Sequence, residues 1–259
     1  MFTISEAELL HLLGIWTWPF LRIAGMVMTA PIMGTRVVPG RTRMILTLAL
    51  CGVIVPLLPT PPPVEILSAT GLLVGTQQLL IGAAIGLVIR LVFVVVEIAG
   101  QIVAQQMGLG FASLVDPQTG LQVPVLSQFY IILTTLIFFS LDGHLLLIAT
   151  LVDSFVILPV GLTGIGRGGL DLVLDWSSTL FSGALAIALP IVVALLVINF
   201  AFGVMARSAP QLNVFAVGFP VMILFGVFMI YLTLGNLETH LRVNFDAAFV
   251  VARELLRSP

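Results

Sequence analysis

Long stretches of this sequence contain no charged side chain. The two longest cover residues 176–206 and 208–237, and Arg207 alone separates them. A helix of about 20 mostly apolar residues crosses the hydrocarbon core of a bilayer, which is about 30 Å thick. Further apolar stretches cover residues 9–34 (interrupted by Arg22), 44–64, 66–89 and 117–141, with a less regular one at 143–166. The sequence therefore predicts an all-α membrane protein with about six long hydrophobic helices or helical hairpins.

The low charge content excludes an ordinary water-soluble domain. Only 8% of the residues are charged, whereas soluble domains carry about 25%. Because so few charges cannot build a water-facing surface, we expect lipid or partner subunits to cover much of the chain. The formal net charge of −2 gives no electrostatic basis for binding nucleic acid.

The inventory of reactive side chains argues against an enzyme. All ten basic residues are arginines, and both a Walker A loop and a Schiff base need a lysine amine. The single cysteine, Cys51, permits neither an intramolecular disulfide nor a multi-cysteine metal site. His11, His144 and His240 are scattered without metal-ligand spacing. We therefore expect no catalytic residue, no cofactor and no bound metal.

Prolines divide the apolar stretches. Pro56, Pro59 and residues 61–63 should end the second stretch early, and Pro190 and Pro220 lie inside the last two. Proline removes a backbone hydrogen bond and kinks or breaks a helix, and in lipid the freed groups need partners in protein or water. Partly broken helices therefore favour an assembly or a cavity over a lone bundle in lipid. Ordinary kinks in a packed bundle are the alternative.

A charge interrupts the first apolar stretch at Arg22. An arginine at the centre of a bilayer costs about 2.5–3.5 kcal/mol on insertion scales, so it should be paired or face water. The alternative is a position near the membrane interface, from which the side chain snorkels to water.

A polar stripe is predicted in the middle of the chain. Glu97, Gln101 and Gln105 are four residues apart and share one face of a helix, and Arg90 lies near the same face. Polar side chains in an apolar helix avoid lipid and face a partner or water. The stripe is therefore either a seam of hydrogen bonds to another helix or subunit, or the wall of an aqueous path.

The helical pattern ends directly after this stripe. Gly108 and Gly110 weaken a helix, and Asp116-Pro117 followed by Gly120 is turn chemistry. The apolar flanks place this loop at or near membrane depth, where irregular backbone must be buried in protein or line water. The methionine and phenylalanine in it can fill gaps and repack, which suits a movable plug. A plain interhelical loop is the alternative.

Two blocks of the sequence resemble motifs of a known family. Residues 106–112, Gln-Met-Gly-Leu-Gly-Phe-Ala, and then Asp116-Pro117-Gln118 are similar to the central motif of the FliR family of flagellar export-gate proteins. Residues 205–220, Met-Ala-Arg-Ser-Ala-Pro-Gln-Leu-Asn-Val-Phe-Ala-Val-Gly-Phe-Pro, resemble the late motif of that family. Asp142-Gly143-His144 stands where the family carries an Asn/Asp-Gly-His turn. The length and the order of segments match over essentially the whole chain.

This resemblance implies an assembly and a place in the cell. It implies one membrane domain over residues 1–259, with a FliP-like part over about 1–170 and a FliQ-like part over about 171–259. Such a chain packs with FliP-like and FliQ-like subunits into a helical hetero-oligomer, next to FlhB-like and FlhA-like export components. The implied location is the bacterial inner membrane at the flagellar basal body. There the gate would pass unfolded flagellar proteins across the membrane.

The resemblance also implies roles for individual residues. The loop after the polar stripe corresponds to the plug of the family, which projects into the closed pore. The implied plug residues are Gln106, Met107, Gly108, Leu109, Gly110, Phe111, Asp116 and Pro117. The stripe of Arg90, Glu97, Gln101 and Gln105 then belongs to a subunit contact or to the pore wall.

Two other functions stay open at this point. A homologous gate subunit of a virulence injectisome shares much of the same chemistry, although the late block matches the flagellar form more fully. A secondary transporter for a small solute would also have broken helices and buried charges. It should show an internal repeat with paired interrupted helices, and the sequence shows no clear repeat.

Overall fold

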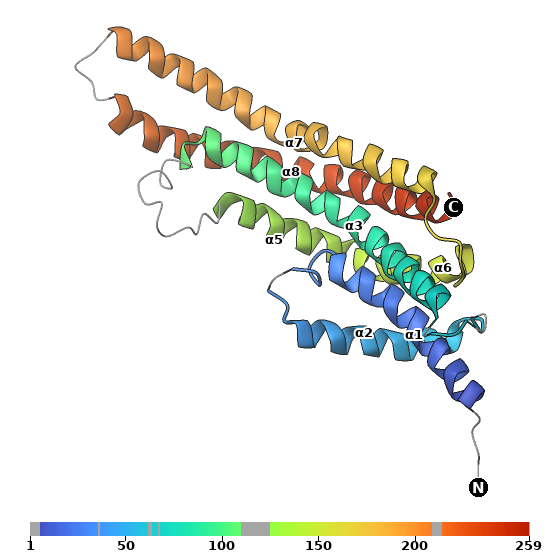
Figure 1. The fold of residues 1–259 in the computed structure, drawn as a ribbon. Coiled ribbons are helices and arrows are strands. Elements are labelled where there is room, and N and C mark those ends of the chain that lie inside the picture. Colours follow the sequence, from blue (N-terminus) through green and yellow to red (C-terminus); the bar gives the residue numbers. More distant parts are fainter. Residues whose placement is uncertain are drawn as a thin grey trace. The chain divides into compact units, whose positions relative to one another are not determined.

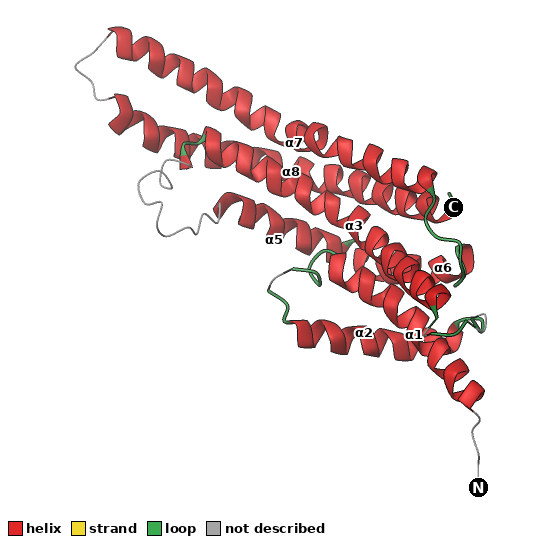
Figure 2. Cartoon of the chain, in the orientation of Figure 1, coloured by secondary structure: helices red, strands yellow, loops and turns green. Residues whose placement is uncertain are grey.

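The computed structural model describes residues 6–35, 37–61, 64–66, 68–109, 125–208 and 214–258. All regular elements in these ranges are helices, and no strand occurs among them (Figure 2). In chain order (Figure 1) they are α1 (Glu6–Thr29), α2 (Gly40–Ile54), the short 3-10 helix η1 (Val55–Leu57), α3 (Ala69–Gln106), α5 (Val125–Ser140), α6 (Gly143–Ile157), α7 (Arg167–Ser208) and α8 (Val214–Arg257). The predicted all-α class is confirmed.

Helix length and hydropathy confirm a membrane protein. Among the described residues, four helical segments are long and apolar enough to cross a bilayer, namely 40–57, 69–106, 167–208 and 217–257. α5 and α6 pass the same test only together, as a bent pair, which would make five spans. The predicted number of about six is thus approximate. α5 has 16 residues and α6 has 15, so each alone is shorter than the roughly 20 residues that a span needs.

Proline affects these helices unequally. α2 ends at Ile54, directly before the 3-10 turn that contains Pro56, so the predicted early end is confirmed. α7 and α8 instead continue through Pro190 and Pro220 over 42 and 44 residues. No helix break occurs at these two prolines, so the alternative of ordinary kinks in a packed bundle remains for them. Loss of one backbone hydrogen bond does not by itself end a long helix in a membrane protein.

A tight turn separates α5 from α6. Asp142 has φ 54° and ψ 25°, in the left-handed region, which aspartate tolerates better than most residues. Its carbonyl oxygen accepts hydrogen bonds from the N–H groups of Leu145 at 2.9 Å and Leu146 at 3.0 Å, and these bonds start α6. The turn predicted at Asp142-Gly143-His144 is confirmed.

The chain forms two compact units. The first contains residues 1–91, 142–177 and 245–259, and the second contains residues 92–141 and 178–244. The limits between them fall inside α3, α7 and α8, so each unit contains a part of each of these helices. The units do not follow the implied boundary near residue 170. The division into FliP-like and FliQ-like parts stays a prediction.

Close helix packing builds the core of the first unit. A Cβ atom at Gly82 of α3 would overlap the carbonyl group of Arg22 in α1, so only glycine permits this approach. Further along, Thr29 Oγ1 donates a hydrogen bond to the carbonyl oxygen of Ala83 at 2.9 Å. Small residues bring membrane helices together in this way. The contact encloses the Arg22 side chain, which is 0% exposed.

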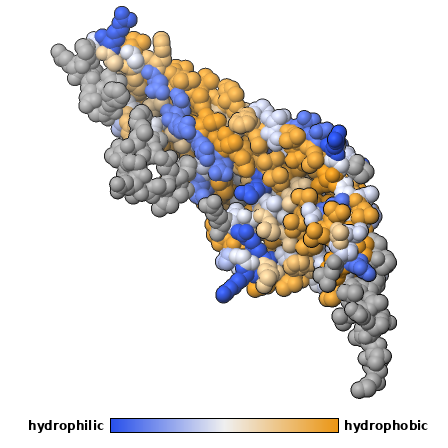
Figure 3. Space-filling view, in the orientation of Figure 1, coloured by the Kyte–Doolittle hydropathy of each residue, from blue (hydrophilic) through white to orange (hydrophobic). Residues whose placement is uncertain are grey.

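Much of the apolar surface of α7 and α8 is uncovered. Only 17% of the most apolar part of α7 and 22% of that of α8 are buried, against 56% for α3. Large exposed side chains on them include Phe181, Phe200, Leu224 and Tyr231. Apolar residues cover much of the face seen in Figure 3, where they are orange. Such a surface must meet lipid or another protein.

Candidate functional site

The polar stripe lies on α3, which continues to Gln106. Arg90 is exposed and belongs to the first unit, while Glu97, Gln101 and Gln105 belong to the second. Glu97 and Gln101 are half-buried and Gln105 is exposed. Side chains on the other faces of the same turns are buried, among them Val96, Ala99 and Val103. The stripe thus lies at the edge of a packed core, where a hydrogen-bond seam and a water-facing wall both fit.

α5 begins directly beside this stripe. Ser127 Oγ donates a hydrogen bond to the carbonyl oxygen of Glu97 at 3.1 Å. A Cβ atom at Gly100 would lie 2.8 Å from Ser127 Cα and 3.2 Å from its backbone nitrogen, closer than packed atoms come. Glycine therefore allows the start of α5 to pack on α3. The two helices that flank residues 110–124 are held against each other at this contact.

A buried methionine and a glycine turn follow directly after the end of α3. The N–H of Met107 donates to the carbonyl oxygen of Val103 at 2.9 Å, so helical hydrogen bonding reaches Met107. Gly108 follows with φ 81°, a conformation that favours glycine and commonly ends helices. Met107 is 2% exposed, whereas Leu109 is 38% exposed. The helix ends where the sequence predicted.

The remaining plug candidates cannot be placed in the same way. Gly110, Phe111, Asp116 and Pro117 lie outside the described residues. For Gln106 to Leu109 the structure gives positions, and the role as a plug stays a prediction. In the late sequence block, α7 ends at Ser208 and α8 begins at Val214, and residues 209–213 also lie outside the described part.

Arg22 forms a buried polar cluster in the first unit. Its Nε donates to Gln78 Oε1 at 2.8 Å, and its Nη2 donates to the carbonyl oxygen of Leu158 at 2.9 Å. Its Nη1 donates to the carbonyl oxygen of Ser154 at 2.8 Å and to Ser154 Oγ at 3.1 Å. The guanidinium carbon lies 4.3 Å from the ring centre of Phe155. One side chain thereby joins α1, α3 and the C-terminal end of α6.

Arg22 is paired, as predicted, and its hydrogen-bond partners are neutral groups. Elsewhere, Arg242 and Glu238 form an ion pair at 3.8 Å on the surface. The snorkelling alternative is wrong, because the Arg22 side chain is fully buried. Its partners are 56, 132 and 136 residues away, so sequence spacing could not identify them. The adjacent glutamines at 77 and 78 in an apolar stretch were the available signal for a buried polar contact.

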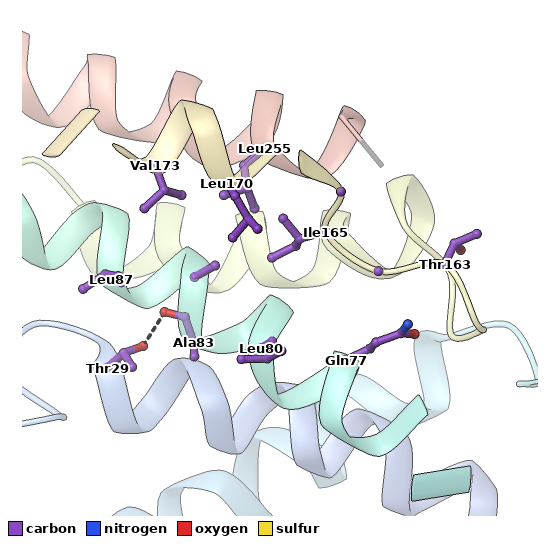
Figure 4. A pocket seen from close by; sticks show the side chains of 13 residues that line it. Thr29, Gln77, Leu80, Ala83, Leu87, Thr163, Ile165, Leu170, Val173 and Leu255 are labelled. Atoms are coloured by element: carbon purple, nitrogen blue, oxygen red, sulfur yellow. Dashed lines mark hydrogen bonds between the residues drawn. The ribbon is translucent and has the colours of Figure 1, made fainter. Parts of the chain in front are cut away.

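An open pocket of about 550 Å³ also lies in the first unit (Figure 4). Thr29 of α1, α3, residues 163–166, the start of α7 and Leu255 line it, and the lining is mainly apolar. Gln77 at one end donates from Nε2 to the carbonyl oxygen of Leu162 at 2.8 Å. None of the lining residues is charged. In the part of the chain that is described, no group of three or more His, Cys, Asp or Glu residues could hold a metal.

Comparison with known proteins gives one consistent result. The family described as bacterial export proteins, family 1, matches residues 13–248. The flagellar biosynthetic protein FliR of Escherichia coli (strain K12) is 37% identical over 227 residues, which cover 88% of this chain and 87% of that protein. FliR of Pectobacterium carotovorum subsp. carotovorum is 34% identical over 258 residues, covering 99% and 98%. FliR of Bacillus subtilis (strain 168) is 30% identical over 240 residues, covering 92% of both.

Proposed function

Since this chain belongs to the FliR family of bacterial export proteins, we propose that it forms a protein-conducting pore with FliP-like and FliQ-like subunits. As a family member it is a membrane component of the flagellar export apparatus, with a transport role rather than an enzymatic one. The proposal adds that the pore lies in the inner membrane at the flagellar basal body. FlhB-like and FlhA-like components act with it, and unfolded flagellar proteins are its cargo.

The family match over residues 13–248 is the observation that carries this proposal. The uncovered apolar surface of α7 and α8 supports it, because helices packed in a hetero-oligomer need such surface. The half-buried Glu97 and Gln101 support it as well, because a polar stripe on an apolar helix suits a subunit contact or a pore wall.

We further propose that residues 106–120 close this pore. Met107, Leu109 and Phe111 supply apolar bulk, and a hydrophobic constriction can block ions by dewetting. The flanking helices support the proposal, because α3 and the start of α5 are packed on each other at Gly100 and Ser127. A closing segment needs such fixed ends if it is to return to one place after each opening.

Deleting Gly108 to Ser113 tests the seal. The complex should still assemble, and the inner membrane should become permeable to small ions, because the apolar constriction is lost. Ion or small-dye uptake in cells measures the leak, and co-purification of the partner subunits measures assembly. A control that replaces the same six residues with a glycine–serine segment keeps the loop length and should leak as well.

A segment that reads substrates would give the opposite result. Export would be lost while the membrane stayed tight, and that outcome would refute the seal. If neither the deletion nor the glycine–serine replacement assembled, the segment would be structural and the seal would also be abandoned.

The injectisome gate is the second candidate, and the comparisons favour the flagellar one. The three relatives described above all carry the name of a flagellar biosynthetic protein. Expression in a flagellated strain that lacks its own FliR should restore motility. Restored injectisome secretion without motility would support the alternative.

A further inference from the structure

The side chain of Met107 packs against a glycine of α8, within the second unit. Gly226 is buried, and so are Met222 and Ile230, one helical turn to either side of it on the same face. A Cβ atom at Gly226 would lie 2.6 Å from Met107 Cγ and 2.7 Å from both Sδ and Cε. Real Cβ atoms essentially never come so close to another atom. The Met107 side chain therefore occupies the space that any larger residue at 226 would need.

This contact is specific to one glycine of α8. Gly235, later in the same helix, has no atom within 4 Å of its Cβ position. Glycine in the interior of a helix is unfavourable compared with alanine, so helix formation does not account for Gly226. Packing against Met107 accounts for a glycine at this position. The flexible, unbranched side chain of methionine can adopt the conformation that packs against a glycine on a helix surface.

We infer that Gly226 positions Met107 and thereby fixes the place where α3 ends. The N–H of Met107 donates an α-helical hydrogen bond to the carbonyl oxygen of Val103 at 2.9 Å, and the N–H of Gly108 donates a tighter 3-10 bond to that of Gln105 at 3.0 Å. Gly108 then changes the chain direction with φ 81°. A fixed residue directly before a turn sets the point from which the chain leaves the helix. This pair positions the seal proposed above and so rests on that proposal.

The contact couples two helices that are far apart in the sequence. Packed interiors leave no spare volume, so α8 cannot move past the end of α3 without displacing Met107. A movement of α8 on opening would therefore shift the start of the closing segment directly. The end of α3 lies against α8 in Figure 1.

Gly226→Ala tests this inference in cells that carry the complete export complex. The added methyl group should displace Met107 and raise ion permeability severalfold. Gly218→Ala is the matched control, since it makes the same change at a buried position of the same helix, where the added Cβ would meet only Phe202 at 3.8–3.9 Å, an ordinary contact. It should leave the membrane tight. Equal permeability of the two variants would overturn the inference.

Met107→Ala removes all three atoms that the added methyl group would meet. In a Met107→Ala background, Gly226→Ala should therefore change neither assembly nor ion permeability much, whichever of the two it changes in the background that keeps Met107. Such non-additivity is the mark of a direct contact. If the two substitutions added independently in both readouts, the pair would not be in contact and the inference would fail.

A cysteine pair tests the geometry without relying on the seal. In a Cys51→Ser background, Met107→Cys with Gly226→Cys should form a disulfide on mild oxidation of the purified complex. Met107 Cγ lies 2.6 Å from the Cβ position at 226, and a disulfide joins side chains whose Cβ atoms are about 3.5–4.5 Å apart. Met107→Cys with Gly235→Cys should not. Without the 107–226 cross-link the inference is wrong. A cross-link combined with a tight deletion of residues 108–113 would instead refute the proposed seal alone.

Discussion

Arg22 shows how a single charge is accommodated among apolar helices without a carboxylate. Two of its hydrogen bonds go to the carbonyl oxygens of Ser154 and Leu158. These oxygens lie at the C-terminal end of α6, which ends at Ile157. Carbonyl groups at a helix C-terminus carry partial negative charge, and that of Ser154 accepts the N–H of Leu158 at 3.0 Å as well as Arg22 Nη1. Arg22 therefore acts as a cap from another helix, and Phe155 covers one face of its guanidinium group.

Arg22→Lys should destabilise the protein although it keeps the positive charge. A lysine ammonium is a point charge that cannot reach Gln78, Ser154 and Leu158 in the fork geometry of arginine, nor stack flat on Phe155. Each buried acceptor left without a donor costs about 1–3 kcal/mol. We expect a lower melting temperature of the purified complex. Arg253→Lys, at an exposed site, is the control, and equal melting temperatures for both variants would contradict the capping role.

Helix ends were predictable where a local signal sets them. Pro56 follows the end of α2, Asp142 makes the turn before α6, and Gly108 ends α3. Pro190 and Pro220 carried the same kind of signal and yet lie inside continuous helices. Pro56 is one of a cluster with Pro59 and residues 61–63, whereas Pro190 and Pro220 are single prolines inside their helices. A single proline in the sequence therefore does not by itself predict the end of a helix.

The packing of α5 on α3 is expected to fail when Gly100 gains a methyl group. The Cβ of Gly100→Ala would meet the backbone of Ser127 at 2.8 Å, and backbone atoms cannot move aside as a flexible side chain can. Overpacking of this kind costs about 1–3 kcal/mol. Thermal unfolding of the complex should show a lower midpoint for Gly100→Ala. Gly52→Ala on α2, with nothing within 4 Å and outside the uncovered faces of α7 and α8, should be neutral or slightly stabilising, and the reverse order would disprove the close contact.

For the whole chain, composition and periodicity led to a membrane-embedded helical class, and two sequence motifs led to the family. Neither could show the contacts that build the sites. Arg22 meets Ser154 across 132 residues, and Met107 meets Gly226 from a different helix. Such pairs depend on how helices pack in three dimensions, and one sequence carries no pairing information between distant positions. The four residues of the polar stripe lie on α3, and the role of the stripe as a contact or a pore wall stays a prediction.

The uncovered apolar surface of this chain predicts that the chain is not stable alone. The long helices α7 and α8 leave most of their apolar parts uncovered, and the sequence has few charges to keep such surfaces apart in solution. Expressed by itself and extracted in mild detergent, the chain should elute as aggregates in size-exclusion chromatography. Co-expression with FliP-like and FliQ-like subunits should give one monodisperse complex, because partner helices then cover this surface. A well-folded, monodisperse monomer without partners would show that lipid or detergent alone suffices, and that the uncovered faces of α7 and α8 are not subunit contacts.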